Sequence, residues 1–288
     1  MSAHFRLLET DPGFRQRQAA LENATARRML LRAAYRTGVT TIPVVVHVVY
    51  RTASENISTA QIKRQIAVLN KDFRATNPDK SKVPLVWKGL VTDSRIKFVL
   101  ASKDPKGKAT TGITRTKTTR TSFGTGDTVK SKSTGGVDGW PSTKYLNVWV
   151  CTLAGGLLGY AQFPGGPAKT DGVVILNTAF GTGGTTRAPF NLGRTATHEI
   201  GHWLNLRHIW GDREDCGGTD YVADTPNASG PNYGKPTFPH ISCNNGPNGD
   251  MFMNYMDYVD DAAMYMLTAQ QVVRIHAALD GPRSSIGT

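Results

Sequence analysis

Hydrophobic residues follow two periodicities along the chain, and each predicts a different element. A nearly unbroken β-branched run at 42–50 is typical of a strand buried within a sheet. Further apolar runs predict strands at 95–101, 145–151 and 172–176. After the first strand, apolar residues recur at i, i+4, i+7 and i+11, which predicts a helix with one face on the sheet, comprising Ile62, Ile66, Leu69 and Phe73.

Capping-box patterns mark the starts of two helices. One, at 58–61, opens the helix just described, and the other, at 268–271, opens a helix near the C terminus. Residues 14–36 mix charged and apolar positions with helical spacing and end at Gly38, which predicts a separate helical arm. The Gly-, Thr- and Ser-rich stretch 107–139 is expected to be a long loop.

The composition indicates a globular protein. With 288 residues, of which 39% are hydrophobic, the chain can bury a full core, as one large domain or two lobes. Its apolar runs are shorter than the 18 or so residues of a membrane span, and the first thirty residues lack the apolar centre of a signal peptide. We therefore expect no membrane span, and the compartment stays open because a signal can be removed before residue 1.

The net charge of +12 and the pI near 9.7 raise the question of nucleic acid. Many basic residues fall within 106–132, where they face only Asp127 and lack interleaved aromatic residues that could stack on bases. We interpret this stretch as a solvated loop and expect no nucleic-acid partner. Its basic residues are Lys106, Lys108, Arg115, Lys117, Arg120, Lys130 and Lys132.

Three cysteines allow one disulfide and one free thiol. Cys216 and Cys243 flank a segment rich in Gly, Pro, Asn and Asp, where a covalent link would replace missing secondary structure, so we pair them. Cys151 lies in an apolar run and is expected to be a buried strand thiol. A zinc site built from the cysteines is disfavoured because no Cys-x-x-Cys spacing is present.

The segment 198–208 carries the chemistry. On a helix, His198 and His202 lie one turn apart on the same face, so both imidazoles can reach one zinc ion. Glu199 lies beside that face and can take a proton from zinc-activated water. His208 fits as third ligand only if the helix stops, because six more helical residues would rotate it by about 240° from His202. Asn205 stands where a left-handed residue could end the helix.

This run, followed by Ile209-Trp210-Gly211-Asp212 and, further on, by Met253-Asn254-Tyr255-Met256-Asp257-Tyr258, resembles the pappalysin family of metzincin metalloproteases, the group that includes ulilysin. The resemblance extends to 42–50, 159–166 and 224–226, and so covers roughly residues 40–280. Metzincins usually carry Gly where this chain has Asn205, which is a departure from the family pattern.

The resemblance implies an α/β (α+β) zincin fold of the metzincin type. We expect a mixed β-sheet and the active-site helix in an upper lobe, residues 39–205, and an irregular lower lobe with a C-terminal helix, residues 206–288. Residues 1–38 would form an N-terminal helical arm or the remnant of a pro-segment. Relatives often block zinc with a pro-segment cysteine, but no cysteine precedes Cys151. A carboxylate such as Glu9 or Asp11 is one possible replacement, and another role for the arm is the alternative.

Several roles follow only from the resemblance. Met256 is expected to be the Met-turn methionine beneath the zinc ligands, and Tyr258 the tyrosine whose hydroxyl binds the oxyanion. Asp261 is expected to form the floor of a pocket that accepts Arg or Lys after the scissile bond. The resemblance also implies calcium, for which oxygen ligands are available from Asp220, Asp224 and Thr225. Secreted relatives carry a disulfide in the region of Cys216 and Cys243.

These features predict a secreted zinc-dependent endopeptidase that cuts on the amino side of Arg or Lys in protein or peptide substrates, and that is a monomer. If so, arginines of the arm become self-cleavage positions: Arg27, Arg28, Arg32 and Arg36. The alternative is a non-catalytic zinc-fold protein that binds basic peptides or anionic surfaces, against which the intact Glu199 argues. Another zinc hydrolase, such as an amidase, is disfavoured by Met256 and His208.

Overall fold

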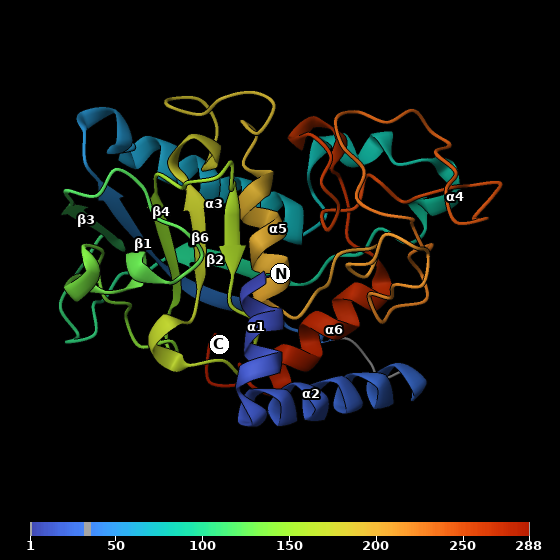
Figure 1. Ribbon diagram of the computed structural model, residues 1–288, viewed down its shortest axis with the longest axis horizontal. Helices are drawn as coiled ribbons and strands as arrows, with labels where there is room; N and C mark the ends of the chain where they lie inside the picture. Colours follow the sequence, from blue (N-terminus) through green and yellow to red (C-terminus); the bar gives the residue numbers. More distant parts are fainter. Residues whose placement is uncertain (1, 32–35, 288) are drawn as a thin grey trace.

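The computed structural model describes residues 2–31 and 36–287 and is built around a mixed sheet of six strands (Figure 1). The strand order is β2-β1-β4-β6-β5, and β3 also pairs with β1. All pairs are parallel except β5 with β6. This confirms the predicted mixed sheet; the strands are β1 (Thr40–Tyr50), β2 (Ile96–Leu100), β3 (Ile113–Lys117), β4 (Leu146–Cys151), β5 (Gly159–Ala161) and β6 (Val173–Leu176).

The central strands are covered on both faces. Every residue of β4 is buried, and β1 is buried along most of its length, which agrees with their unbroken apolar runs. The long loop expected at 107–139 is a partial error, since it contains β3 and two short 3₁₀ helices. Its Lys130 is also not solvated: the side chain is 1% exposed and its Nζ donates to the Thr170 carbonyl at 2.8 Å.

Two helices support the sheet and each other. Helix α3 (Thr59–Phe73) packs against β2 and against α5 (Arg194–Trp203), which in turn packs against β5 and β6. As predicted, Ser58 caps α3 by accepting from the Gln61 N–H at 3.1 Å. The Gln61 side chain does not complete a capping box. It reaches the Phe180 carbonyl at 2.8 Å instead, and so ties α3 to the segment that precedes α5.

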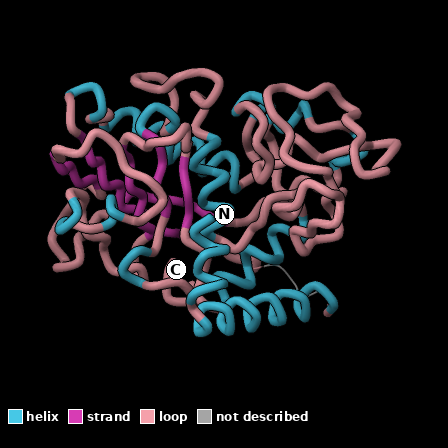
Figure 2. The backbone as a smooth tube through the Cα atoms, in the orientation of Figure 1, coloured by secondary structure: helices cyan, strands magenta, loops and turns pink. Residues whose placement is uncertain are grey.

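The segment between α5 and α6 (Ala269–Asp280) is irregular, as expected: among the described residues it contains only one 3₁₀ helix, Asp261–Ala263 (Figure 2). Buried side chains such as Met251, Tyr255 and Met266 pack it against the common core. The Cys216–Cys243 disulfide closes its outer loop, which confirms the pairing, and Cys151 is a buried thiol. Both partners of the predicted capping box at the start of α6 are present.

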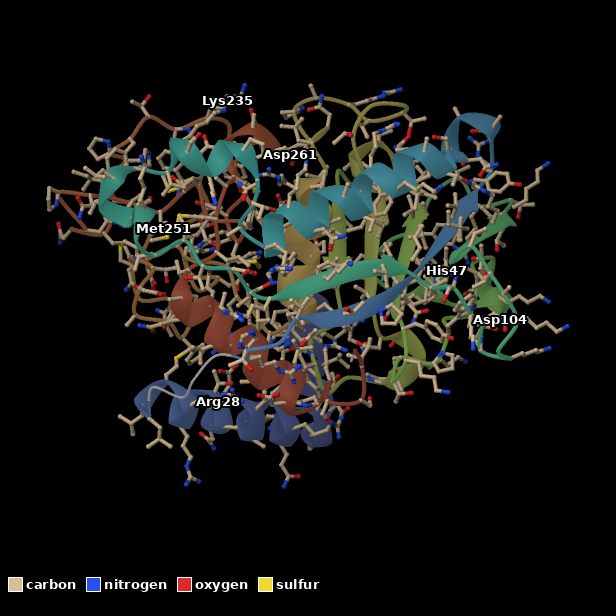
Figure 3. All side chains as sticks on the ribbon, turned by 180° about the vertical axis from the view of Figure 1, so that it is seen from behind. Arg28, His47, Asp104, Lys235, Met251 and Asp261 are labelled. Atoms are coloured by element: carbon tan, nitrogen blue, oxygen red, sulfur yellow. A yellow bond between two sulfur atoms is a disulfide. The ribbon has the colours of Figure 1, made fainter. Side chains whose placement is uncertain are left out.

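Within the arm, expected over 1–38, the described residues form two helices, α1 (Ser2–Thr10) and α2 (Pro12–Leu30), so helical structure begins before residue 14, where the helical pattern starts. The arm is not separate from the rest of the molecule. Helix α2 lies along α6 (Figure 3), burying Phe14 and Leu21, and its Arg28 pairs with Asp280 at the end of α6. The expected helix over 14–36 also falls partly on 32–35, which lie outside the described residues.

The remaining short elements lie in the connections. Helix α4 spans Leu85–Lys88, and 3₁₀ helices span Ala53–Glu55, Pro78–Lys82, Thr128–Lys130, Lys132–Thr134, Ala168–Thr170 and Asn177–Ala179. Of the helices that the structure describes, none has the combination of length and hydrophobicity needed to cross a bilayer.

Candidate metal centre

Three histidines converge at the C-terminal half of α5. The Nε2 atom of His208 lies 3.2 Å from that of His198 and 3.0 Å from that of His202. All three side chains are buried. The structure therefore brings together the three residues that the spacing predicted as zinc ligands.

The chain reverses after α5 at the residue where the sequence required it. Asn205 has φ of +73°, and the Leu206 N–H bonds back to the Gly201 carbonyl at 2.9 Å, while the Asn205 N–H bonds to the His202 carbonyl at 2.9 Å. These two bonds form a Schellman motif, with Asn in the place that Gly usually takes. The Asn205 carbonyl is held in turn by Arg274 of α6, through Nε at 3.2 Å and Nη2 at 3.0 Å.

The hydrogen bonds of the rings define which nitrogen of each histidine is free. Nδ1 of His198 lies 2.8 Å from the Tyr255 carbonyl, and Nδ1 of His202 lies 2.8 Å from the Leu206 carbonyl. Since a carbonyl only accepts, both Nδ1 atoms carry the proton. Nδ1 of His208 lies 2.6 Å from Oδ1 of Asp212, which favours the same tautomer. All three Nε2 lone pairs therefore point into one small space.

Such a set of groups fits a zinc ion. Burial lowers the pKa of all three histidines, that of His198 to about 4, so the rings are neutral. Three neutral Nε2 acceptors, with that of His208 3.2 and 3.0 Å from the other two, cannot hydrogen-bond to one another, and a cation satisfies all of them. Three histidine ligands with their Nδ1 atoms bonded to carbonyls or a carboxylate are typical of zinc sites that keep one position open.

Met256 lies directly beneath the ligand helix. Its side chain is fully buried, and a Cβ atom placed on Gly201 would lie 2.5 Å from its sulfur. Gly201 stands between the two histidines of α5, so this close approach seats the methionine under the metal ligands. The position agrees with the expected Met-turn, whose role remains a prediction.

A cavity of about 370 Å³ opens beside the histidines. His198, Glu199, Tyr258 and Asp261 all line it. Burial raises the pKa of Glu199 to about 7, and the Glu199 side chain packs on the backbone of Gly159, where a Cβ would lie 2.8 Å from its Cγ. The Tyr258 ring is 39% exposed and stands edge-on to His208, with ring centroids 4.7 Å apart.

Residues 130–280, more than half of the chain, match the Peptidase_M43 family, described as pregnancy-associated plasma protein-A. This chain belongs to the Peptidase_M43, or pappalysin, family. An extracellular metalloprotease of Pyricularia oryzae is 32% identical over 252 residues, which are 84% of this pappalysin chain and 76% of the relative. Extracellular metalloprotease 1 of Coccidioides posadasii is 39% identical over 139 residues, 45% of this chain and 48% of that protein. The match thus spans about half the length of that relative.

Solved structures agree with the family and confirm the metzincin-type fold. Mature mirolysin of Tannerella forsythia, in complex with a cleaved peptide, has 49% identity and a TM-score of 0.85, covering 87% of this chain and 96% of that one. A promirolysin mutant has 46% identity and a TM-score of 0.90, covering 98% of this chain and 94% of that one. Family membership implies zinc, which the three-histidine geometry of this pappalysin fits.

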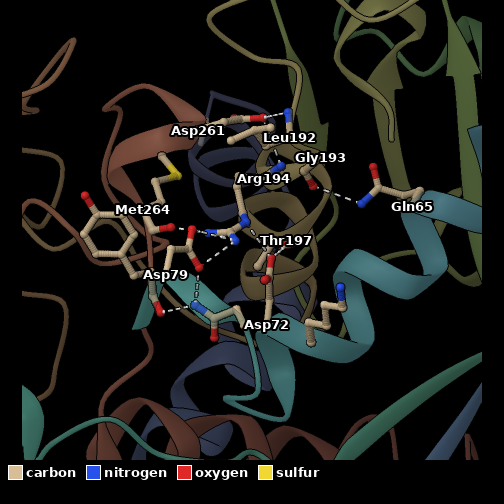
Figure 4. A network of polar contacts seen from close by, with 12 residues as sticks. Gln65, Asp72, Asp79, Leu192, Gly193, Arg194, Thr197, Asp261 and Met264 are labelled. Carbon is tan, nitrogen blue, oxygen red and sulfur yellow. Dashed lines mark hydrogen bonds and ion pairs between the residues drawn. The ribbon is translucent and has the colours of Figure 1, made fainter. Parts of the chain in front are cut away.

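Asp261 has a structural contact that sequence reasoning missed. Its carboxylate is 1% exposed, and Oδ2 accepts from the backbone N–H of Leu192 at 2.7 Å and of Arg194 at 3.2 Å (Figure 4). The N-cap of α5 is Gly193, which has no side chain, so Asp261 caps the ligand helix from another segment. Burial nevertheless raises the pKa of Asp261 to about 6.

Arg194 is the other residue at this end of α5 that the sequence reasoning missed. Its guanidinium lies 3.0 Å from Asp72 of α3 and 3.1 Å from Asp79, and Asp72 also accepts from the Thr197 hydroxyl at 2.7 Å (Figure 4). An arginine in the first turn opposes the helix dipole, and this mismatch is the signal that could have indicated a buried ion pair.

The calcium candidates are only partly brought together. The Thr225 hydroxyl donates to Asp220 at 2.7 Å, and burial raises the pKa of Asp220 to about 7. Asp224 points elsewhere: its carboxylate accepts from the Thr268 hydroxyl and from the Gln270 N–H, both at 2.8 Å, and so caps α6.

Among the described residues, no hydrogen bond joins Glu9 or Asp11 to the three histidines. Asp11 accepts from the Phe14 N–H at 3.0 Å and caps α2, while Glu9 is exposed on α1. His4 of the arm approaches the ligands through one intervening ring, that of Phe163. Its ring lies 4.1 Å from the ring of Phe163, which lies 5.3 Å from that of His202.

The close contact under α5 gives a test of the Met-turn. Replacing a helix-interior glycine by alanine normally favours the helix by about 0.5–1 kcal/mol. Gly201→Ala should instead lower the free energy of unfolding by about 1–3 kcal/mol, because the new methyl group overlaps Met256, and should weaken zinc binding. Urea unfolding and zinc titration measure both quantities. Gly89→Ala is the control, since nothing lies within 4 Å of a Cβ there; a more stable Gly201→Ala protein would contradict the assignment.

Proposed function

We propose that the chain is a secreted zinc-dependent endopeptidase that hydrolyses peptide bonds in protein or peptide substrates. The observation that carries the proposal is the placement of Glu199 on the wall of the cavity that His198, one of the three convergent histidines, also lines. A protein that only bound basic peptides would have no need of a buried carboxylate at this place. The extracellular metalloproteases among the relatives support secretion.

The substrate would bind as an additional strand along β5. This strand is the edge of the sheet and contains Gly159, against which Glu199 packs. An extended peptide can pair with such an edge through its backbone, which brings successive carbonyl groups past the cavity. The proposal places the scissile bond between β5 and the histidines, with the following side chain directed into the cavity.

The residues of the chain supply proton transfer and charge stabilisation. Bound zinc would contribute Lewis acidity, which polarises a peptide carbonyl and makes a water molecule more acidic. Glu199, with a pKa near neutrality, would accept the proton of the attacking water and return it to the leaving amine. The Tyr258 hydroxyl would donate to the developing oxyanion, an interaction commonly worth about 2.7–4 kcal/mol.

We also propose that residues 1–38 act as a pro-segment of a catalytic unit formed by residues 39–288. The promirolysin structure covers 98% of this chain, whereas the mature form covers 87%. The part of this chain that only promirolysin matches is therefore about as long as the arm. Arm side chains reach the loop after β5, where Arg17 donates to the Gly165 carbonyl at 2.7 Å and Gln18 to the Pro164 carbonyl. The docked arm thus lies beside the proposed substrate edge.

Replacing the general base tests activity and self-processing together. Glu199→Ala should lower the rate of peptide cleavage by about 10²–10⁴-fold with zinc still bound.

The same substitution tests self-processing. The unaltered protein should lose its arm by cleavage before Arg27, Arg28 or Arg36, whereas Glu199→Ala keeps it; Arg32 lies outside the described residues. Mass spectrometry of peptides and of the intact chain measures both. Glu214→Ala, which changes an exposed glutamate of the next loop, is the control. Full activity of Glu199→Ala would refute the role, and an intact arm in active enzyme would refute self-processing.

We propose that Asp261 selects Arg or Lys at the position after the scissile bond. Two substitutions of Asp261 distinguish this role from helix capping. Asp261→Asn keeps an oxygen that can accept from Leu192 and Arg194 but removes the charge, so the preference for basic residues should fall by about 10- to 100-fold at unchanged stability. Asp261→Ala should lose the same preference and also about 1 kcal/mol of stability. Peptide-library cleavage and urea unfolding decide; an Asp261→Asn enzyme with unaltered preference would exclude the assignment.

We retain a structural calcium ion as a proposal, centred on Asp220 and Thr225, with Asp224 contributing only if it leaves α6. Two observations support it: the buried Asp220 carboxylate has no positive partner among its hydrogen-bond contacts, and the surrounding loop has little secondary structure. A calcium-specific chelator should lower the melting temperature by about 2–4 °C for each kcal/mol of binding energy lost. Asp220→Asn should abolish the response, and a melting temperature that ignores the chelator would count against the ion.

A further inference from the structure

His208 is held differently from the other two histidines. His198 and His202 stand on α5 and donate to backbone carbonyl groups, whose positions follow from the fold. His208 lies after the helix has ended, and its Nδ1 atom contacts a side chain, the carboxylate of Asp212, at 2.6 Å. The Nδ1 atom of the third ligand is therefore held by a side chain, which a substitution can remove, and not by the backbone.

The backbone conformation at Gly211 and Asp212 directs the Asp212 carboxylate toward the His208 ring. Gly211 and Asp212 both have positive φ, +65° and +59°. A Cβ on Gly211 would lie 2.0 Å from the backbone nitrogen of Thr219, so the turn is closed tightly against the following loop. A non-glycine residue in the left-handed region costs energy, and such strain is found where the surrounding structure imposes it.

A second contact fixes the plane of the same ring. The Trp210 ring lies parallel to that of His208, with centroids 4.2 Å apart and an angle of 8° between the planes. Trp210 is 5% exposed, and Tyr258 packs edge-on against it at 4.8 Å. Trp210 thus prevents the ring from tilting, while the Asp212 carboxylate prevents it from rotating.

We propose that Asp212 is a positioning residue for the metal centre, which holds His208 as third zinc ligand. By accepting a hydrogen bond from the Nδ1–H group it keeps the Nε2 lone pair directed at the other two histidines, and its negative charge makes Nε2 a stronger electron-pair donor to the metal. The inference rests on the proposed zinc function. It assigns to the short segment Trp210-Gly211-Asp212 the task that backbone carbonyl groups perform for the ligands on α5.

A contact that only tied His208 to its loop would affect the stability of the fold but not the affinity for zinc. The test therefore measures zinc affinity, by competition with a chromogenic chelator, in the 288-residue chain carrying Glu199→Ala so that the arm is not lost by self-cleavage. Asp212→Gly removes the carboxylate and suits the positive φ, and Asp212→Asn keeps an acceptor but loses the charge. Asp215→Asn, an exposed carboxylate of the same loop that pairs with Arg213, is the matched control.

The proposal predicts a graded loss. Asp212→Gly should raise the zinc dissociation constant by about 10- to 100-fold, Asp212→Asn by a smaller factor, and Asp215→Asn should leave it unchanged. The melting temperatures of the zinc-free proteins show whether each variant folds. Equal affinity of Asp212→Gly and the parent, within a factor of about two, would overturn the proposal. If Asp212→Gly does not fold, Asp212→Asn decides by the same criterion. A parent that binds no zinc would instead refute the proposed function.

Discussion

The structure depends on three imidazole lone pairs that share one buried space. Uncharged Nε2 atoms 3.0 and 3.2 Å apart repel one another, and burial prevents the rings from escaping this by taking up protons. The arrangement therefore persists only because the rest of the protein holds it, or because a cation binds. Each ring is held through its other nitrogen by a different segment, at Tyr255, Leu206 and Asp212.

The need to hold three lone pairs together explains why His208 lies outside helices and strands. The residues that contact the rings, Tyr255, Leu206 and Asp212, lie outside them as well. A continuous helix can present two of the ligands but not the third, so the chain must reverse at Asn205 and return. Tyr255 and Met256 then have to reach the underside of α5 from a segment whose only helix, among the described residues, is the 3₁₀ turn Asp261–Ala263. That segment is stabilised by buried aromatic and methionine side chains, by Asp261 at the start of α5, and by the Cys216–Cys243 disulfide.

The features that the sequence predicted well are local. The buried strands, the ligand helix, its stop at Asn205 and the cap of α6 each follow from neighbouring residues, and the structure agrees with all of them. Features that depend on distant partners were missed. β3 is a Thr- and Lys-containing edge strand without clear alternation, and it forms because β1 offers it a pairing partner. Lys130 is buried because Asp127 and the Thr170 carbonyl compensate its charge, which no local pattern reveals.

The arm and the metal centre share one guanidinium group. Arg274 is 1% exposed and donates to the Asn205 carbonyl, the group that follows the reversal, while its Nη1 and Nη2 atoms lie 2.7 and 2.8 Å from the Glu22 carboxylate of α2. A buried arginine requires a negative partner, and here the arm supplies it. The Asn205 amide also donates to Glu22 at 3.3 Å. The docked arm is therefore linked to the metal centre. Its Glu22 neutralises Arg274, and Arg274 holds the turn between the second and third histidines.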